Sequence, residues 1–238
     1  SWQALEQAIR VASREKSHLM GLHIVSNESE RDSDFVKGLA EQFETRCQNA
    51  GLVGEFAVDV GGVASTISAR ARWSDLVVLY LAHPPESQIT SRISSGIRSL
   101  IQRCPRPILT VHPEARKLER FLVAYDGSPK ANEALFLATY LAGHWEASLV
   151  VLTVSEKGKI PLWASFRAKR YLDSHNINAK FIQKEGKVGE SILETVDEED
   201  VDMILMGGYS RKPVAEVILG SSLDVVLRNA QHPVFICR

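Results

Sequence analysis

The stretch that decides the fold runs from Val201 to Ser210 and reads VDMILMGGYS. An apolar run typical of a buried strand ends there in two glycines. Ten residues after Ser210, the sequence GSS (Gly220–Ser222) begins a helical pattern that continues to Asn229. A strand that leads through glycines to a helix headed by serine gathers backbone N–H groups, hydroxyl groups and the positive end of a helix dipole. The stretch therefore predicts an α/β fold with an anion or phosphate site.

An internal repeat extends over the whole chain. Three pairs of segments match, and they are Arg106–Thr110 with His232–Ile236, Gly61–Ile67 with Gly186–Ile192, and Leu22–Ser26 with Val151–Ser155. The first pair is offset by 126 residues. A period of this length is far above that of a solenoid repeat and has the size of one domain. The sequence therefore predicts two copies of one domain.

The second copy alternates apolar strands with helical patterns. Its expected strands are 121–125, 148–154, 179–183, 203–206 and 234–237, and its expected helices are 129–144, 162–175, 188–198 and 221–229. Continuous apolar strands are typical of a parallel sheet covered by helices on both faces. Ligands of such sheets bind beyond the carboxyl ends of the strands. Because Asp126-Gly127-Ser128 and Gly207 both follow strand ends, we expect them to share one crevice.

The first copy begins at its first helix. Residues 2–14 match the helix that opens near Ala131, so the counterpart of strand 121–125 would lie before Ser1. We expect such upstream residues, because a sheet without that middle strand leaves backbone groups unpaired. The later elements expected are strands 19–25, 55–60, 76–81 and 108–111 and helices 35–50, 63–73 and 94–104. The predicted organisation is an N-terminal domain at 1–112, a linker at 113–120 and a C-terminal domain at 121–238.

Composition and charge exclude several classes of protein. The chain has 238 residues, is 45% hydrophobic and carries a formal net charge of -1, which is typical of a globular protein and argues against a nucleic-acid partner. The longest apolar run, 76–82, is far shorter than the roughly 20 residues that cross a bilayer. The three scattered cysteines form neither a disulfide framework nor a metal motif, so we expect a reduced, cytoplasmic location.

The order and spacing of the motifs resemble the universal stress protein family. The resemblance is carried by the Asp126-Gly127-Ser128 turn, the Gly186-x-Val188-Gly189-x-x-Ile192 helix start, the Gly-x2-Ser-x9-Gly-Ser spacing from Gly207 to Ser221 and the closing run 233–236. It covers the entire chain, which looks like a tandem, two-domain member. The resemblance implies two Rossmann-like α/β domains, each with a five-stranded, mostly parallel sheet and helices on both faces, the first strand of the N-terminal domain lying outside this chain.

The resemblance also implies an adenine nucleotide site in the second domain. In members that bind ATP, the turn after the first strand and the end of the second strand contact the adenosine, and the glycine loop holds ribose and phosphates. Carried over, the nucleotide-binding residues are Ala124, Asp126, Gly127, Val154, Met206, Gly207, Ser210, Gly220, Ser221 and Ser222. The implied ligand is ATP or another adenine nucleotide, with Mg²⁺ accompanying it and no separate metal site. Ser210 stands where the family pattern has a second glycine.

The first copy lacks this chemistry. Its counterpart of the glycine loop reads LAHPP at Leu81–Pro85, in which prolines have removed amide donors. We therefore expect nucleotide in the C-terminal domain only, and we interpret His83 as a solvated loop residue. The acidic run 197–200 is interpreted as a solvated turn. Among the tryptophans, Trp163 is expected to matter most, because it lies near the proposed crevice.

Catalytic motifs of the common hydrolase and metalloenzyme types do not occur, so we do not expect an enzyme. Slow ATP hydrolysis is an alternative, because a bound Mg²⁺-nucleotide needs only a positioned water. The expected function is that of an ATP-binding regulatory protein of the stress response, with a protein partner that the sequence does not identify. The other interpretation is a nucleotide-independent interaction module, such as the soluble regulatory tail of a transporter.

The two copies are expected to pair with each other. Strands 108–111 and 234–237 hold the same position in their copies, and both are apolar edge strands. Exposed apolar edges tend to be paired. We therefore predict an internal pseudo-dimer in which these strands run antiparallel, with a homodimer of whole chains as a further assembly.

Overall fold

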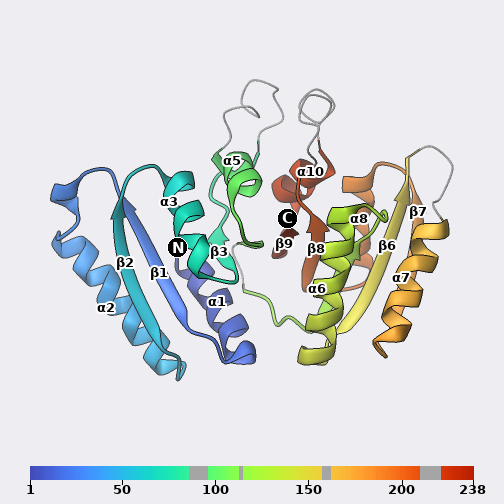
Figure 1. The fold of residues 1–238 in the computed structure, drawn as a ribbon, viewed down its shortest axis with the longest axis horizontal. Helices are drawn as coiled ribbons and strands as arrows, with labels where there is room; N and C mark the ends of the chain where they lie inside the picture. Colours follow the sequence, from blue (N-terminus) through green and yellow to red (C-terminus); the bar gives the residue numbers. More distant parts are fainter. Residues whose placement is uncertain (86–95, 113–114, 157–161, 210–220) are drawn as a thin grey trace.

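The computed structural model describes residues 1–85, 96–112, 115–156, 162–209 and 221–238, and it is an α/β structure built from two repeats (Figure 1). The first repeat contains α1 (Trp2–Glu15), β1 (Leu19–Val25), η1 (Glu28–Glu30), α2 (Asp34–Asn49), β2 (Gly54–Val60), α3 (Val63–Arg70), η2 (Ala71–Trp73), β3 (Val77–Tyr80), α5 (Gly96–Arg103) and β4 (Ile108–Val111). The second contains β5 (Arg120–Ala124), α6 (Pro129–Trp145), β6 (Ser148–Ser155), α7 (Leu162–Ser174), β7 (Ala179–Glu185), α8 (Val188–Glu198), β8 (Met203–Gly207), α10 (Ser222–Asn229) and β9 (Val234–Cys237).

The expected elements are present, with ends that differ by one or two residues. The largest difference is in the helix expected at 63–73, which ends at Arg70 and continues as the 3-10 turn η2. The expected helix at 221–229 begins at Ser222, because the Ser221 hydroxyl caps it by accepting a hydrogen bond from the Leu223 N–H at 3.1 Å. Residues 94 and 95 of the helix expected at 94–104 lie outside the described residues.

The strands form one seven-stranded sheet and one two-stranded sheet. The order in the large sheet is β3-β4-β9-β8-β5-β6-β7, and β1 pairs with β2 in the small one. The five strands of the second repeat all run parallel. Strand β4 pairs antiparallel with β9, with Leu109 opposite Phe235, so the predicted pairing of the two repeats is confirmed.

Equivalent backbone hydrogen bonds confirm the repeat. The Gly61 N–H donates to the Val25 carbonyl at the end of β1, and the Gly186 N–H donates to the Ser155 carbonyl at the end of β6. Both glycines have positive φ, at 147° and 136°. One detail of the sequence alignment is wrong, because the structure sets Val25 against Ser155 rather than against Val154. A match of apolar residues alone does not fix the hydrogen-bond register of a strand.

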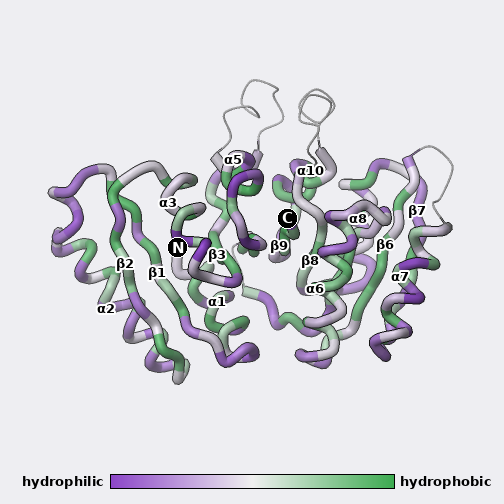
Figure 2. Tube along the Cα trace, in the orientation of Figure 1, coloured by the Kyte–Doolittle hydropathy of each residue, from purple (hydrophilic) through white to green (hydrophobic). Residues whose placement is uncertain are grey.

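Two large apolar clusters contain residues from both repeats, and a third, smaller one lies within the first repeat among α1 and α2. One combines Val11 and Leu109 with Phe121, Leu205 and Phe235, and the other combines residues of α5 and β4 with residues of α8, β8 and α10. Figure 2 shows the strands as mostly hydrophobic segments. The core is therefore shared between the repeats along the large sheet. Within the described residues, no helix has the length and hydropathy needed to cross a bilayer.

Two histidines lie at one end of the β4–β9 junction. His112 and His232 are each two residues beyond the Thr110–Val234 pair. Burial lowers the pKa of His112, to which the nearby His232 adds, and burial also lowers the pKa of His232. Both rings therefore stay neutral in the folded protein at a pH where the unfolded chain binds protons.

Stability is expected to fall as the pH drops below about 6.5, the pKa of an unfolded histidine. Each proton that only the unfolded chain binds adds at most about 1.4 kcal/mol per pH unit to the slope of the unfolding free energy against pH. Replacing His112 by asparagine is expected to flatten the slope of the unfolding free energy between pH 7.5 and 5.5, measured by urea denaturation. Replacing Gln48, which is exposed and does not titrate, by asparagine is the control and is expected to leave the slope unchanged. An unchanged slope in the His112 variant would contradict this account.

Candidate functional site

The two loops singled out by the sequence lie against each other. Gly207 ends β8, and a Cβ built on it would lie 2.8 Å from the Lys130 Cβ and 3.3 Å from the Ala131 backbone nitrogen. The first turn of α6 therefore packs directly on the end of β8. The Lys130 ammonium group reaches across and donates to the Tyr209 carbonyl. The Asp126 turn and the exit of β8 thus form one continuous surface at the carboxyl ends of β5 and β8.

The turn between β5 and α6 is built by local hydrogen bonds. Asp126 is exposed, and its Oδ1 accepts a hydrogen bond from the Ser128 N–H at 2.8 Å. The Ser128 hydroxyl in turn accepts from the Ala131 N–H at 3.2 Å and caps α6, whose first residue is Pro129. This is the geometry that an Asp-Gly-Ser-Pro sequence favours at a helix start. The cap fixes the Asp126 carboxylate at the carboxyl end of β5.

Trp163, near the start of α7, lies on this turn. A Cβ built on Gly127 would lie 2.3 Å from the Cη2 atom of Trp163, so the indole ring packs on the bare Gly127 backbone. Gly127 also has a φ of 80°, which favours glycine. The ring itself remains 59% exposed. Trp163 therefore forms an aromatic wall beside the Asp126 carboxylate.

Replacing Gly127 by alanine is expected to lower the free energy of unfolding by about 1–3 kcal/mol, from the positive φ and from the contact with Trp163. Urea denaturation measures the loss. Adding Trp163→Ala is expected to restore the part that comes from the steric contact, because it removes the ring that the new Cβ would meet. Gly38→Ala is the matched control, since a Cβ there meets nothing within 4 Å. Equal stability of the Gly127 variant and the wild type would contradict this assignment.

The remaining predicted residues divide into three groups. Ala124 and Val154, near the ends of β5 and β6, are half-buried, and Met206 is buried in β8. Ser221 and Ser222 lie at the start of α10, where the Ser221 hydroxyl is the helix cap and Ser222 is the first helical residue. Ser210 and Gly220 lie outside the described residues.

Gly208, the second residue of the Gly207-Gly208 pair, extends the pairing of β8 with β9. The Gly208 N–H donates to the Cys237 carbonyl at 2.6 Å, which continues the pairing of β8 with β9. A Cβ on Gly208 would lie 2.9 Å from that carbonyl oxygen. The Gly208 amide is therefore used by the sheet and does not donate to an anion at the β8 exit. The first repeat has the same bond, from the Leu81 N–H to the Val111 carbonyl.

A buried polar cluster directly behind the site escaped the sequence analysis. The Tyr209 hydroxyl donates to Asp224 Oδ1 at 2.5 Å, and Arg98 Nη1 lies 3.2 Å from Asp224 Oδ2. The Arg98 guanidinium lies over the Tyr209 ring, 4.4 Å from its centroid. The side chains of Arg98 and Asp224 are only 5% and 1% exposed. The cluster therefore joins α5 of the first repeat to α10 and the β8 exit of the second.

A signal for this cluster is present in the sequence. Arg98 and Asp224 are 126 residues apart, which is the offset of the repeat in this region, so they occupy matching positions on α5 and α10. Residues in matching positions of two copies can meet at the pseudo-twofold axis that relates the copies. Two identical domains would bring two identical side chains together there, whereas this chain has side chains of opposite charge, which indicates a contact.

Comparison with known proteins gives the same assignment from independent data. Residues 162–238 match the model of the universal stress protein family. A universal stress protein of Synechocystis sp. is 22% identical over 169 residues, which are 69% of this chain and 58% of that protein. One from Methanocaldococcus jannaschii is 29% identical over 70 residues, which are 29% of this chain and 43% of that protein. Residues 162–238 thus match the universal stress protein family, and the chain as a whole is similar to members of that family. Its match spans about half the length of these relatives.

Solved universal stress protein structures have the same fold. One from Archaeoglobus fulgidus superposes with a TM-score of 0.82 at 18% identity, over 99% of this chain and 91% of that chain. A putative universal stress protein of Pseudomonas aeruginosa gives a TM-score of 0.70 at 17% identity, over 98% of this chain and 87% of that chain. The likeness extends over both repeats, so the predicted tandem arrangement of two α/β units is confirmed at the level of the fold.

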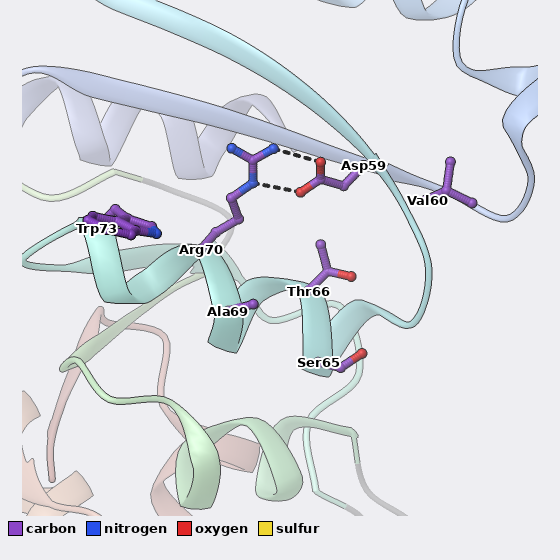
Figure 3. Close-up of a pocket in the computed structure, with 7 residues that line it drawn as sticks. All are labelled: Asp59, Val60, Ser65, Thr66, Ala69, Arg70 and Trp73. Carbon is purple, nitrogen blue, oxygen red and sulfur yellow. Dashed lines mark hydrogen bonds and ion pairs between the residues drawn. The ribbon is translucent and has the colours of Figure 1, made fainter.

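Two depressions are lined by residues that the structure describes. The first is lined by Asp59, Val60, Ser65, Thr66, Ala69, Arg70 and Trp73 (Figure 3). Its Arg70 Nε and Nη2 donate to the two Asp59 carboxylate oxygens at 2.7 and 2.6 Å, and these bonds lower the pKa of Asp59. The second lies between α6 and α7 and begins at Tyr125, the neighbour of Asp126. Among the described residues, no group of three or more His, Cys, Asp or Glu side chains could hold a metal ion.

The other residues weighed from the sequence have ordinary surroundings. His83 is exposed in the segment that replaces the glycine loop in the first repeat, while Leu81 and Pro85 are buried. The Pro85 carbonyl accepts a hydrogen bond from Arg228 of α10 at 2.8 Å, which ties this segment to the second repeat. In the acidic run, Glu199 pairs with Lys180 and Glu198 with Lys184 at the surface.

Proposed function

We propose that the protein is a regulatory universal stress protein that binds one adenine nucleotide per chain, in the second repeat. The observation that carries the proposal is the contact between the Asp126 turn and the β8 exit, where Lys130 packs on Gly207 and bonds to the Tyr209 carbonyl. An acidic rim, a cationic side chain and a helix start at neighbouring strand ends are the features that a nucleotide crevice requires.

The chemistry of the donor set fits such a ligand. Asp126 offers an exposed carboxylate oxygen to a ribose hydroxyl, an adenine amine or a hydrated Mg²⁺. The start of α10, the Ser222 hydroxyl and the Lys130 ammonium group favour phosphate oxygens. Trp163 adds a flat aromatic surface next to Gly127 on which a base can stack. The first repeat offers Leu81 and two prolines at the matching place, which supports a single site.

Calorimetric titration with Mg²⁺-ATP tests this proposal. We expect a stoichiometry of one for the wild type and loss of binding for Gly220→Val, because a bulky side chain would stand against the phosphates. Ser210→Gly is expected to tighten binding about tenfold, equivalent to about 1.4 kcal/mol, if its side chain opposes the phosphates. Gly38→Ala, far from the site in sequence and open in space, is the control. A stoichiometry of two, or unchanged binding by the Gly220 variant, would refute the proposed site.

One observation favours the second candidate function, a nucleotide-independent interaction module. The Lys130–Tyr209 contact and the Trp163 ring both occupy space beside the crevice, and the Gly208 amide is already paired. Mass spectrometry of small molecules released from the denatured, purified protein separates the two functions. A co-purified adenine nucleotide supports the first, and its absence together with a flat ATP titration supports the second.

The division into domains at 1–112 and 121–238, with a linker at 113–120, is part of this proposal. It is supported by the matching turns Gly61 and Gly186 and by the matching left-handed helix ends at Lys16 and Glu146. We propose a regulatory rather than an enzymatic role, in which nucleotide occupancy alters how the repeats present themselves to a protein partner.

A further inference from the structure

We propose that the groove between α6 and α7 is a second ligand site, and that its ligand is an aromatic carboxylate. The groove has a volume of about 580 Å³, which is in the range of small-molecule pockets. Both helices belong to the second repeat, and the first repeat contributes none of the lining residues. None of these residues is assigned above to the adenine nucleotide, although Tyr125 is the neighbour of Asp126. The two proposed sites therefore adjoin without sharing a residue.

Aromatic side chains from both helices line the groove. Phe136 of α6 and Tyr171 of α7 lie against each other, with ring centroids 4.6 Å apart and an interplanar angle of 40°. The rings of Phe136 and Phe166 are nevertheless exposed, at 46% and 64%. Large apolar side chains that stay exposed in a concave place are typical of a binding site. An aromatic ligand that lies on these rings covers their apolar surface and gains offset or edge-to-face ring contacts.

The formal charges in the groove are all positive. Arg167 and Arg170 line it, both residues are exposed, and no acidic residue is among the lining residues. Among the residues that the structure describes, neither guanidinium group forms an ion pair. The two arginines are three positions apart, so they lie on one face of α7. A guanidinium group presents a planar fork of donors that matches a carboxylate, so the two arginines supply the anion-binding part of the site.

Tyr125 and Asn132 provide the polar groups at the end of the groove nearest to the Asp126 turn. Tyr125 is 2% exposed, and its hydroxyl donates to Asn132 Oδ1 at 2.7 Å. Because this bond uses the Oδ1 atom, the Asn132 Nδ2 group is the donor left for a ligand. Burial raises the pKa of Tyr125, and the positive charge of Arg167 opposes that rise, so Arg167 acts at this end of the groove. An amide donor and a guanidinium group thus flank the aromatic surface.

Shape and charge favour a small carboxylate over an anionic membrane surface or a nucleotide. Helices that bind a membrane surface present an exposed apolar face to the lipid, with cations beside it. Here the rings of two helices line a concavity, and Phe136 is partly covered by Tyr171. Two guanidinium groups match one carboxylate, whereas a nucleoside triphosphate carries more negative charge than the groove can pair.

Calorimetric titration of the whole chain with β-naphthoate tests the proposal. We expect one site per chain, and about tenfold weaker binding of β-naphthamide, which has the same rings without the charge. The double variant Arg167→Gln, Arg170→Gln is expected to bind β-naphthoate about tenfold more weakly than the wild type. Lys169→Gln is the matched control and leaves binding unchanged, because Lys169 lies on the same helix, pairs with Asp173 and does not line the groove.

Phe166→Ala tests the aromatic wall and is expected to weaken β-naphthoate binding about tenfold, with an unchanged circular dichroism spectrum because the side chain is 64% exposed. A titration in saturating Mg²⁺-ATP separates this site from the nucleotide crevice, and we expect the same β-naphthoate affinity there. Competition between the two ligands would overturn the proposal of a separate site. Absence of β-naphthoate binding, or equal binding by the double arginine variant, would overturn the proposal altogether.

A membrane surface is tested with phosphatidylglycerol vesicles. Vesicle binding that the double arginine variant loses, in a chain that does not bind β-naphthoate, would overturn the proposal in favour of a lipid surface. Failure of the chain to bind Mg²⁺-ATP would refute the nucleotide site and leave the α6–α7 site standing, because the two rest on different residues.

Discussion

Replacing Asp224 by alanine is expected to lower the free energy of unfolding by about 3–5 kcal/mol. The Asp224 side chain is 1% exposed. Its Oδ1 accepts a hydrogen bond from the Tyr209 hydroxyl at 2.5 Å, and its Oδ2 lies 3.2 Å from Arg98 Nη1. Its removal takes away the carboxylate that lies 3.2 Å from the buried Arg98 guanidinium, in a site where both side chains are at most 5% exposed. The cost is dominated by that buried charge rather than by the loss of an attraction. Urea denaturation followed by circular dichroism measures the change.

Two further variants make the result interpretable. Asp173→Ala removes an ion pair with Lys169 in which both side chains are about 60% exposed, and it is expected to cost less than about 0.5 kcal/mol. The triple variant Arg98→Met, Tyr209→Phe, Asp224→Leu removes the polar groups together and is expected to lose less than about 2 kcal/mol. If the Asp224 and Asp173 variants lost equal stability, the buried cluster would not have the role that we assign to it.

Replacing Leu109 by alanine is expected to cost about 2–5 kcal/mol, the range for deleting a fully buried leucine side chain. Leu109 lies in β4, is 0% exposed, and stands opposite Phe235 of β9 at the junction of the repeats. The cavity would open in the cluster that Val11 and Phe121 also share. Because that cluster belongs to both repeats, we expect one cooperative unfolding transition in the wild type and in the variant.

Val53→Ala is the control for this experiment, since Val53 is 58% exposed and its truncation should change the free energy by less than about 0.5 kcal/mol. Tryptophan fluorescence reports on both repeats, and backbone circular dichroism reports on the whole chain. Separate transitions by the two probes, or a loss below about 1 kcal/mol for the Leu109 variant, would show that the repeats do not share a core in the way described.

The order of elements could be predicted from the sequence because it depends on local patterns. Apolar runs, the Ser128-Pro129 helix start and the Gly61 and Gly186 turns each act within a few residues of themselves. The proximity of Asp126 and Gly207 also followed, because parallel strands direct their carboxyl ends to one edge of the sheet. The antiparallel pairing of β4 with β9 followed from two apolar edges in matching positions.

Sequence alone thus determined the α/β class and the duplication, and it placed Asp126 and Gly207 at neighbouring strand ends, because apolar period, turn residues and repeat offset can be read from the order of residues alone. The tertiary structure decided what depends on distance across the fold. It engaged the Gly208 amide in the sheet, laid Trp163 on Gly127 and buried Arg98 with Asp224 between the repeats. Such contacts join residues 29 to 126 positions apart, and a sequence pattern does not tell which groups meet across that separation until the packing of the sheet is fixed.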